Sequence, residues 1–217
     1  MPVLEAHGIR ATFYVLPDPV QRRQSHWRAL AAAGHEIGNH TTTHPCSANF
    51  RFSRGNALED YTLERMAAEI DGASAGIGTL LGLRPRTFAY PCGQSFVGRA
   101  EGRRSYVPLV ARRFLAARGY GSEASNDPGR CDLAHLEAFT ADGLGAGRLL
   151  ELVEGDSTAG RWVILAGHDV GEGGEQTVLV EALEALCRRA GQADVWVAPV
   201  AEVAAYLRQL PSRRALA

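Results

Sequence analysis

The stretch Gly38-Asn39-His40-Thr41-Thr42-Thr43-His44-Pro45 decides how the rest of the chain is interpreted. It follows a short apolar run, and its two histidines stand four residues apart. Three β-branched threonines and a proline disfavour a regular helix, so we expect a strand that runs out into a tight turn. Neutral imidazole is the commonest protein ligand for zinc, which makes His40 and His44 a candidate pair of metal ligands. The competing interpretation is two loop histidines that bond to backbone or water, and this stretch alone favours neither.

Composition and charge exclude several classes of function. The 217 residues suffice for one sizeable α/β domain with its own core. The net charge of -1 provides no electrostatic footprint for nucleic acid or for an acidic membrane. No apolar run approaches the roughly 20 residues that span a bilayer. Residues 1–8 lack the basic start and long apolar stretch of a signal peptide, which predicts a cytoplasmic location for the chain as written. The oligomeric state is left open.

Strand-like and helix-like segments alternate along the chain. The expected strands span residues 11–16, 36–39, 87–90, 162–166 and 195–198, with a short one near residue 120. The expected helices span residues 19–33, 60–81, 106–118, 148–154, 176–189 and 200–210. No hairpin signal is evident, and residues 45–58 and 94–106 are expected to be irregular loops. This alternation predicts an α/β fold with a parallel sheet, either an open doubly wound sheet or a (β/α) barrel.

Candidate functional residues follow three of these strands. His40 follows residues 36–39, the turn Tyr90-Pro91-Cys92-Gly93 ends the strand at 87–90, and His168 follows the strand at 162–166. Chemistry in a parallel barrel gathers at the carboxyl ends of the strands, so we expect all three on that rim. A lone histidine after a strand is more often structural, and only this shared position favours a role for His168.

The four cysteines predict reduced thiols. Cys46, Cys92, Cys131 and Cys187 are widely spaced, and the chain contains no CxxC pair that would indicate a structural zinc site. Scattered thiols are typical of a reducing compartment. We therefore expect plain thiols at Cys46 and Cys92, although both fall in loops near the candidate residues.

Four segments together resemble the polysaccharide deacetylase family, which is carbohydrate esterase family four. Residues 8–15 (GIRATFYV) resemble the second strand of that family, and residues 40–44 (HTTTH) fit its metal motif H-[ST]-x-x-H. Residues 88–93 (FAYPCG) resemble the third motif, in which a proline turn carries an oxyanion donor. Residues 165–168 (LAGH) resemble the fifth motif, a pocket leucine followed by a catalytic histidine. The likeness covers nearly the whole chain.

The resemblance implies a distorted parallel (β/α) barrel, formed here by a single catalytic domain over residues 1–217. It implies a divalent metal, most commonly zinc, and a substrate that is an N- or O-acetylated carbohydrate or a related small amide. The roles that it implies fall on seven residues: His40 and His44 as metal ligands, the Cys92 backbone N–H as oxyanion donor, His168 as general acid, and Tyr90, Pro91 and Leu165 in the substrate pocket.

The chain departs from the family pattern in three motifs. The first motif, T-F-D-D, supplies a catalytic base and a third metal ligand, and it has no counterpart here, so we expect an N-terminally incomplete barrel without its first strand. Ala89 replaces the usual arginine of the third motif, and Asp127 is a weak match to the fourth, which orients the acid histidine. Asp18 and Asp169 are poor substitutes for the base, because Asp18 is better explained as a helix N-cap and Asp169 points away from its neighbour His168.

Three interpretations remain at this stage. The first is a metal-dependent deacetylase in which Met1 is an internal methionine. The second is a catalytically inactive homologue that binds a glycan or a metal without turnover. The third is a plain α/β binding protein in which His40 and His44 have no chemical role. For the chain as written we expect weak zinc binding and no release of acetate, because two histidines make an incomplete metal site.

Overall fold

A computed structural model describes residues 2–157, 159–192 and 194–210. The chain divides into two compact units. The first, the four-stranded unit, comprises residues 12–119 and 132–136. The other, the second unit, comprises residues 1–11, 120–131 and 137–217, and each unit is described by itself. The assignment of residues 1–217 to one catalytic domain stays a prediction.

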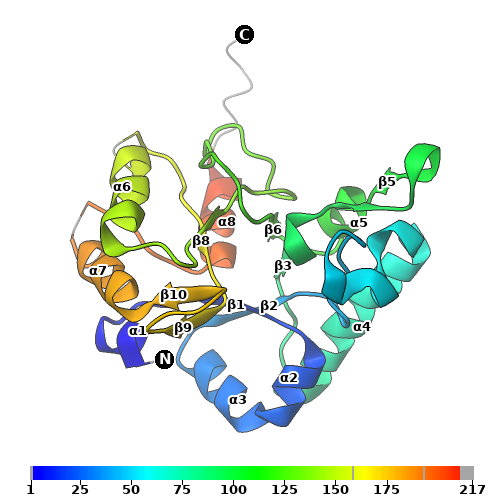
Figure 1. The fold of residues 1–217 in the computed structure, drawn as a ribbon. Helices are drawn as coiled ribbons and strands as arrows, with labels where there is room; N and C mark the ends of the chain where they lie inside the picture. Colours follow the sequence, from blue (N-terminus) through cyan, green and yellow to red (C-terminus); the bar gives the residue numbers. More distant parts are fainter. Residues whose placement is uncertain (1, 158, 193, 211–217) are drawn as a thin grey trace. The chain divides into compact units, whose positions relative to one another are not determined.

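A parallel sheet forms the centre of the four-stranded unit (Figure 1). Its strands are β1 (Thr12–Val15), β2 (Glu36–Asn39), β3 (Thr87–Ala89) and β6 (Ala116–Arg118), in the order β1-β2-β3-β6. Asn39 pairs with Phe88 across β2 and β3, which brings the carboxyl ends of these strands together. The parallel α/β architecture predicted from the alternating pattern is therefore confirmed.

Helices connect these strands, and their ends follow local sequence signals. They are α2 (Pro17–Arg22), α3 (Gln24–Ala32), α4 (Leu63–Leu81) and α5 (Val107–Ala111), with short 3₁₀ turns η1 (Arg51–Asn56), η2 (Leu58–Asp60), η3 (Pro91–Gly93) and η4 (Ala100–Gly102). The Thr62 side chain caps α4 by accepting from the Arg65 N–H, and Gly82 ends it in the left-handed conformation. The single helix expected over residues 19–33 is broken at Arg23, and its N-cap is Leu16 rather than Asp18, which instead pairs with Arg22.

Aromatic side chains dominate the core of this unit. Phe88 on β3 stacks on Phe114 and meets the edges of Tyr90 and Tyr106. The other buried members of this core cluster are Leu58, Tyr61, Met66, Ile70, Val97, Val110 and Ala117. A second cluster of Val15, Val20, Ile37 and Ile77 packs α2 and α4 against β1 and β2. Burial of these apolar side chains fixes the strand ends from which the candidate histidines emerge.

The described residues of the second unit form two short parallel strand pairs and four helices. The pairs are β7 (Phe139–Thr140) with β8 (Leu165–Ala166), and β9 (Asp169–Gly171) with β10 (Thr177–Leu179). The helices are α1 (Pro2–Ala6), α6 (Ala146–Ser157), α7 (Val180–Ala190) and α8 (Val200–Gln209). Leu149, Val178 and Ala182 form a buried cluster with Ala141, which places the turn after β7 against α6 and α7.

Several expected elements are wrong because strand pairing overrides the local pattern. The helix expected over residues 106–118 ends at Ala111, since residues 116–118 pair with β3. The loop 94–106 contains an antiparallel pair, β4 (Phe96–Val97) and β5 (Arg104–Ser105). Residues 177–179 pair as β10, so α7 begins later than expected, and the described residues of 195–198 form no strand. Short apolar runs do not distinguish strand from helix without knowledge of their neighbours.

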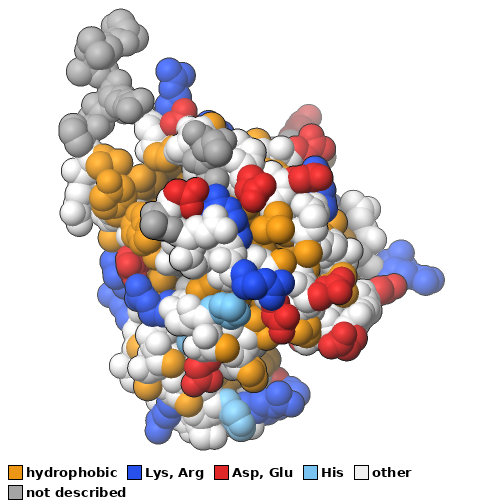
Figure 2. Space-filling view, turned by 90° about the vertical axis from the view of Figure 1, so that its left-hand side faces the viewer, with side chains coloured by type: hydrophobic (Ala, Val, Ile, Leu, Met, Phe, Trp, Pro, Cys, Tyr) orange, Lys and Arg blue, Asp and Glu red, His pale blue; other side chains and the backbone are white. Residues whose placement is uncertain are grey.

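Surface character agrees with the near-neutral composition. Figure 2 shows basic and acidic side chains interspersed over the visible face rather than gathered by sign. Among the described residues, no helix has the length and apolar character needed to cross a bilayer.

Candidate metal and acid–base sites

His40 emerges from the end of β2 with its imidazole oriented by the backbone. Its Nδ1 lies 2.8 Å from the Ala89 carbonyl oxygen at the end of β3. A carbonyl oxygen can only accept, so Nδ1 carries the hydrogen and Nε2 keeps its lone pair. A backbone carbonyl on the second ring nitrogen is the usual arrangement for a histidine that ligates a metal. The geometry of His40 therefore suits metal ligation through Nε2.

The turn from His40 to His44 holds two residues in a strained backbone conformation. Thr41 and His44 have φ values of 65° and 54°, in the left-handed region that β-branched and bulky residues avoid. The His44 N–H donates to the Thr41 Oγ1 at 3.0 Å, which closes the turn. The His40 and His44 ring centroids then lie 4.7 Å apart, edge to face. Strain of this kind persists only where the surroundings enforce it, and it clusters at functional sites.

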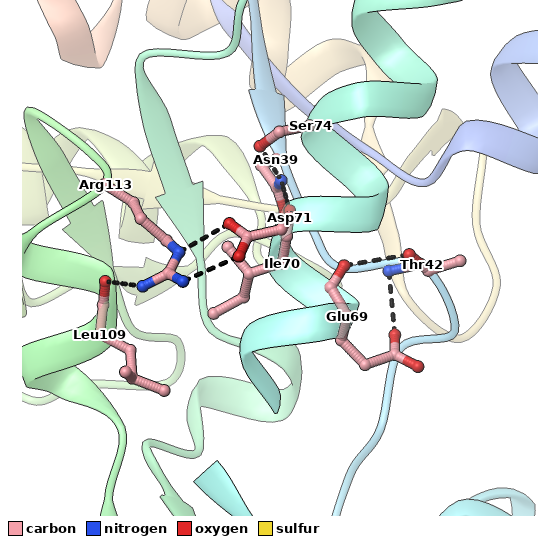
Figure 3. Close-up of polar contacts among 8 residues, drawn as sticks. All are labelled: Asn39, Thr42, Glu69, Ile70, Asp71, Ser74, Leu109 and Arg113. Carbon is pink, nitrogen blue, oxygen red and sulfur yellow. Dashed lines mark hydrogen bonds and ion pairs between the residues drawn. The ribbon is translucent and has the colours of Figure 1, made fainter. Parts of the chain in front are cut away.

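Helix α4 supplies the groups that enforce this turn (Figure 3). Buried Asn39 donates to the Ile70 carbonyl and to Ser74 Oγ at 2.9 and 2.8 Å, and its Oδ1 accepts from the Thr41 N–H. Glu69 accepts the N–H groups of Thr42 and Thr43 at 3.1 and 2.9 Å. Both ends of the turn are thus tied to one helix, which holds the two imidazoles in a defined arrangement.

A disulfide joins the histidine turn to the turn after β3, and the prediction of plain thiols at Cys46 and Cys92 is wrong. The two Cα atoms lie 6.0 Å apart, although the residues are 46 positions apart in sequence. Cys92 also adopts a left-handed conformation, with φ of 53°. The fold brings these two loops together, and sequence spacing contains no information on that approach. Cys131 and Cys187 are not in a disulfide, as expected.

The residues at this rim fit a metal only as a partial ligand set. Imidazole nitrogens suit zinc and cobalt, and catalytic zinc sites usually have three protein ligands. Among the described residues, the one group of three whose ligand atoms lie within 4.8 Å of one another is His44, Cys46 and Cys92. No carboxylate joins His40 and His44 in such a group within those residues. Among the described residues, this rim would therefore supply two nitrogen ligands to a metal, from His40 and His44.

Two phenylalanines lie beside the histidines and face solvent. Phe50 and Phe52 are 41% and 68% exposed, and their ring centroids lie 5.5 Å apart. The Phe52 ring lies 6.4 Å from that of His44. No sequence pattern predicted this pair, because a polar, irregular loop contains no periodic signal that marks an exposed aromatic residue.

Tyr90 and Pro91, which the resemblance places in a substrate pocket, are both buried. The Tyr90 hydroxyl donates to the Ala134 carbonyl at 2.7 Å, and burial raises the pKa of this phenol. Its ring belongs to the aromatic core, so its side chain supports the turn that carries Cys92. A direct contact of either residue with substrate stays a prediction.

His168 in the second unit forms a hydrogen-bonded pair with Asp142. The His168 Nδ1 lies 2.7 Å from Asp142 Oδ2, and the His168 N–H donates to Oδ1 at 3.0 Å. The Tyr120 hydroxyl donates to the same carboxylate at 2.8 Å. Burial alone would raise the pKa of Asp142, but these hydrogen bonds outweigh it and hold the pKa below its usual value. The ionised carboxylate accepts from Nδ1–H, which leaves Nε2 of His168 for proton transfer.

Asp142, rather than Asp127, is the carboxylate that orients His168. Asp127 pairs with Arg161 and accepts from the Gly129 N–H, so its assignment to the fourth motif is wrong. Asp142 follows β7, a two-residue strand too short to show any periodicity. Gly167 permits the approach, because a Cβ there would collide with the Val178 side chain and press on Asp142. Leu165, the expected pocket residue, lies on β8 and is half-buried against Leu149 and its neighbours.

Comparison with protein families supports the resemblance drawn from the motifs. The polysaccharide deacetylase family model matches residues 1–100. A gellan lyase from Bacillus sp. is 31% identical over 115 residues, which are 53% of this chain and 4% of that protein. A chitooligosaccharide deacetylase from Bradyrhizobium sp. (strain ANU 289) is 42% identical over 45 residues, which are 21% of this chain and 20% of that protein. The chain thus spans only a minor part of the length of these relatives.

Solved structures confirm the fold. A family 4 acetyl xylan esterase from Clostridium thermocellum, in complex with a cobalt ion, aligns with a TM-score of 0.63 at 20% identity, over 97% of this chain and 83% of that one. The peptidoglycan deacetylase PdaC from Bacillus subtilis aligns with a TM-score of 0.59 at 17% identity, over 96% and 82%. The α/β fold of the polysaccharide deacetylase type, predicted from the motifs, is the fold of this chain.

Proposed function

We propose that this chain, whose first 100 residues match the polysaccharide deacetylase family, is a metal-dependent hydrolase that removes acetyl groups from a carbohydrate polymer or a related amide. The observation that carries the proposal is the arrangement of His40, whose Nδ1 lies 2.8 Å from the Ala89 carbonyl oxygen and whose ring centroid lies 4.7 Å from that of His44. Zinc is the metal that we propose, because two imidazoles suit it well.

Each group in the proposal has one step to perform. His40 and His44 would hold the metal, which would supply polarisation of the acetyl carbonyl and a more acidic water molecule. The Cys92 N–H donates to the oxyanion that develops on the acetyl group, and the disulfide restrains the turn that presents it. His168, held by Asp142 through Nδ1, delivers a proton to the leaving amine from Nε2.

The exposed phenylalanines support a carbohydrate as the substrate. Phe50 and Phe52 present apolar faces to solvent next to His44. The apolar C–H faces of a pyranose ring pack on such rings, while the acetyl group has to reach the metal position. We propose that Phe52 contacts a sugar ring of the polymer, which a small acetylated amide does not provide.

A second candidate function is binding without turnover. Among the described residues, no carboxylate joins His40 and His44 in a three-ligand group, and the resemblance implies carboxylates there as the catalytic base and the third metal ligand. This arrangement favours a chain that binds zinc and an acetylated glycan but does not release acetate.

Acetate release from N-acetylated sugar oligomers, measured with zinc added, tests the proposal. The incomplete metal motif alone predicts no acetate release, whereas the proposed hydrolase predicts turnover that falls at least a hundredfold in His40→Ala and in His168→Gln. Phe52→Ala is expected to raise KM for the oligomer and to leave hydrolysis of a small acetylated amide unchanged. His26→Ala, on the exposed surface of α3, is the matched histidine control.

Oligomer binding without acetate release in the wild type would favour the second candidate. Equal turnover in the wild type and His40→Ala would show that the histidine pair holds no catalytic metal. Far-ultraviolet circular dichroism of each variant, recorded in parallel, separates these two results from loss of folding.

A further inference from the structure

The three-ligand group at the disulfide points to a second metal site, which shares His44 with the histidine pair. We propose that reduction of the Cys46–Cys92 disulfide converts it into a redox-controlled site, in which both thiolates and a ring nitrogen of His44 bind one zinc-class divalent ion. The ligand atoms of these three residues all lie within 4.8 Å of one another. Two sulfurs and one imidazole nitrogen form a donor set that favours zinc and cobalt over magnesium or calcium.

The distance between His44 and Cys46 already suits a tetrahedral ion. The His44 Nδ1 lies 3.6 Å from the Cys46 Sγ. Nitrogen and sulfur ligands at about 2.1 and 2.3 Å from a tetrahedral zinc lie about 3.6 Å from each other. The two sulfurs have to separate to about 3.8 Å when the bond between them is broken, and the ligand atoms of His44 and Cys92, now within 4.8 Å of each other, have to reach about 3.6 Å. The site therefore needs a small side-chain movement and no refolding.

Contacts other than the disulfide keep the two cysteines together. The Cys46 N–H donates to Ser53 Oγ, and its carbonyl accepts from the Leu58 N–H at 3.0 Å. The Ser47 N–H donates to Gln94 Oε1 at 2.7 Å and thus joins the residue after Cys46 to the turn that contains Cys92. Because these contacts do not involve sulfur, the reduced thiols stay close to each other and to His44.

A dithiol reductant can convert the Cys46–Cys92 disulfide into two thiols. Its two thiols supply two electrons and two protons, the bond between the Cys46 and Cys92 sulfurs breaks, and the reductant closes to its own disulfide. Metal binding then releases one proton from each protein thiol, because the thiolate is the ligand. Cys92 and His44 are half-exposed, so both the reductant and the ion have access, while Cys46 is buried.

The site also changes the role of His44. The same imidazole belongs to the histidine pair and to the thiolate group, so an ion held by the thiolates draws His44 away from His40. A reducing environment would in this way switch the rim from the nitrogen pair to the sulfur site. Metal binding alone tests the thiolate site, and its outcome does not depend on whether the proposed hydrolase activity exists.

Cobalt binding to the reduced chain is the decisive experiment. A Cys131→Ser/Cys187→Ser background removes the other two thiols; it is reduced with a phosphine, which becomes the phosphine oxide, and desalted without oxygen. We expect one equivalent of Co²⁺ to produce a sulfur-to-cobalt charge-transfer band, to release two protons, and to be displaced by Zn²⁺. The band should persist in His40→Ala. In His44→Ala, the apparent affinity for Co²⁺ should fall at least tenfold.

Absence of the band in the reduced background would overturn the proposal, and so would a band that survives Cys46→Ser. If Cys46→Ser does not fold, alkylation of the reduced Cys131→Ser/Cys187→Ser protein tests the same site without that variant. Zinc is expected to protect Cys46 and Cys92 from iodoacetamide at least tenfold, as measured by peptide mass spectrometry. Equal alkylation with and without zinc would refute the site.

Discussion

At the scale of single residues, the pair of Asp142 and His168 shows how a buried carboxylate stays ionised. The Asp142 side chain is 10% exposed, yet it accepts hydrogen bonds from the His168 Nδ1, the His168 N–H and the Tyr120 hydroxyl. Charge-assisted bonds of this kind offset the loss of hydration. Tyr120 also bonds with Thr140 at 2.8 Å, which connects the carboxylate to β7.

The lowered pKa of Asp142 predicts a loss of stability in acid. A carboxyl whose pKa is lower in the folded state stabilises the fold above its ordinary pKa of about 4. That contribution disappears as the pH falls through the lower, folded pKa, because the unfolded chain takes up the proton first. We expect Asp142→Asn to destabilise the protein by about 2 kcal/mol at neutral pH and to flatten this acid dependence, as measured by urea unfolding between pH 7 and about 2.

Glu151→Gln is the control for Asp142, since Glu151 belongs to an exposed ion pair with Arg148 in the same unit. Its unfolding curves should follow those of the wild type within about 0.5 kcal/mol at each pH. If Asp142→Asn kept the acid dependence of the wild type, the assignment of a lowered pKa to Asp142 would be wrong.

At the scale of elements, α4 stabilises its surroundings through two kinds of polar contact (Figure 3). Asn39 is fully buried and bonds with Ile70, Ser74 and Thr41. Asp71 forms a two-point ion pair with Arg113 at 2.7 and 2.8 Å, but its side chain is 58% exposed. Breaking a buried hydrogen bond lowers the free energy of unfolding more than breaking an ion pair that water screens. The two contacts of α4 therefore differ in how much they stabilise the fold.

These contacts predict unequal effects of two substitutions. Asn39→Ala should lower the free energy of unfolding by about 3 kcal/mol, because it leaves buried partners without their bonds. Asp71→Asn should lower it by less than about 1 kcal/mol. Chemical denaturation of both variants measures the difference, and Ser74→Ala, which removes one partner of Asn39, should fall between them. Equal losses in the first two variants would contradict the ranking.

At the scale of the whole molecule, the disulfide is the longest covalent restraint. It closes a loop between residues 46 positions apart, and loop closure of this length corresponds to about 4 kcal/mol in the chain-entropy account. We expect the Cys46→Ser/Cys92→Ser double variant to lose about that amount in urea unfolding. Cys131→Ser, at a half-exposed cysteine outside the disulfide, should change stability by less than about 0.5 kcal/mol. A loss below about 1 kcal/mol in the double variant would show that the unfolded chain is already restrained.

Local patterns predicted much of the fold and part of the site. The strand expected at residues 36–39 is present, and the helix stop expected at Gly34 coincides with a glycine whose φ is 88°. The histidine turn, the proline turn and the histidine after β8 could be found because each combines a residue type with a strand end. Asp142 and the phenylalanine pair could not, because a two-residue strand and an irregular loop have no periodicity.

The sequence by itself determined the alternation of strands and helices, the metal motif and the resemblance to polysaccharide deacetylases, since these depend on residue order over short distances. Tertiary structure alone decided that Asp142 orients His168, that Asn39 and Glu69 hold the histidine turn, and that Cys46 and Cys92 form a disulfide. The physical reason is that each of these contacts joins residues at least 26 positions apart. Their approach depends on how apolar faces pack, which no local pattern of residues specifies.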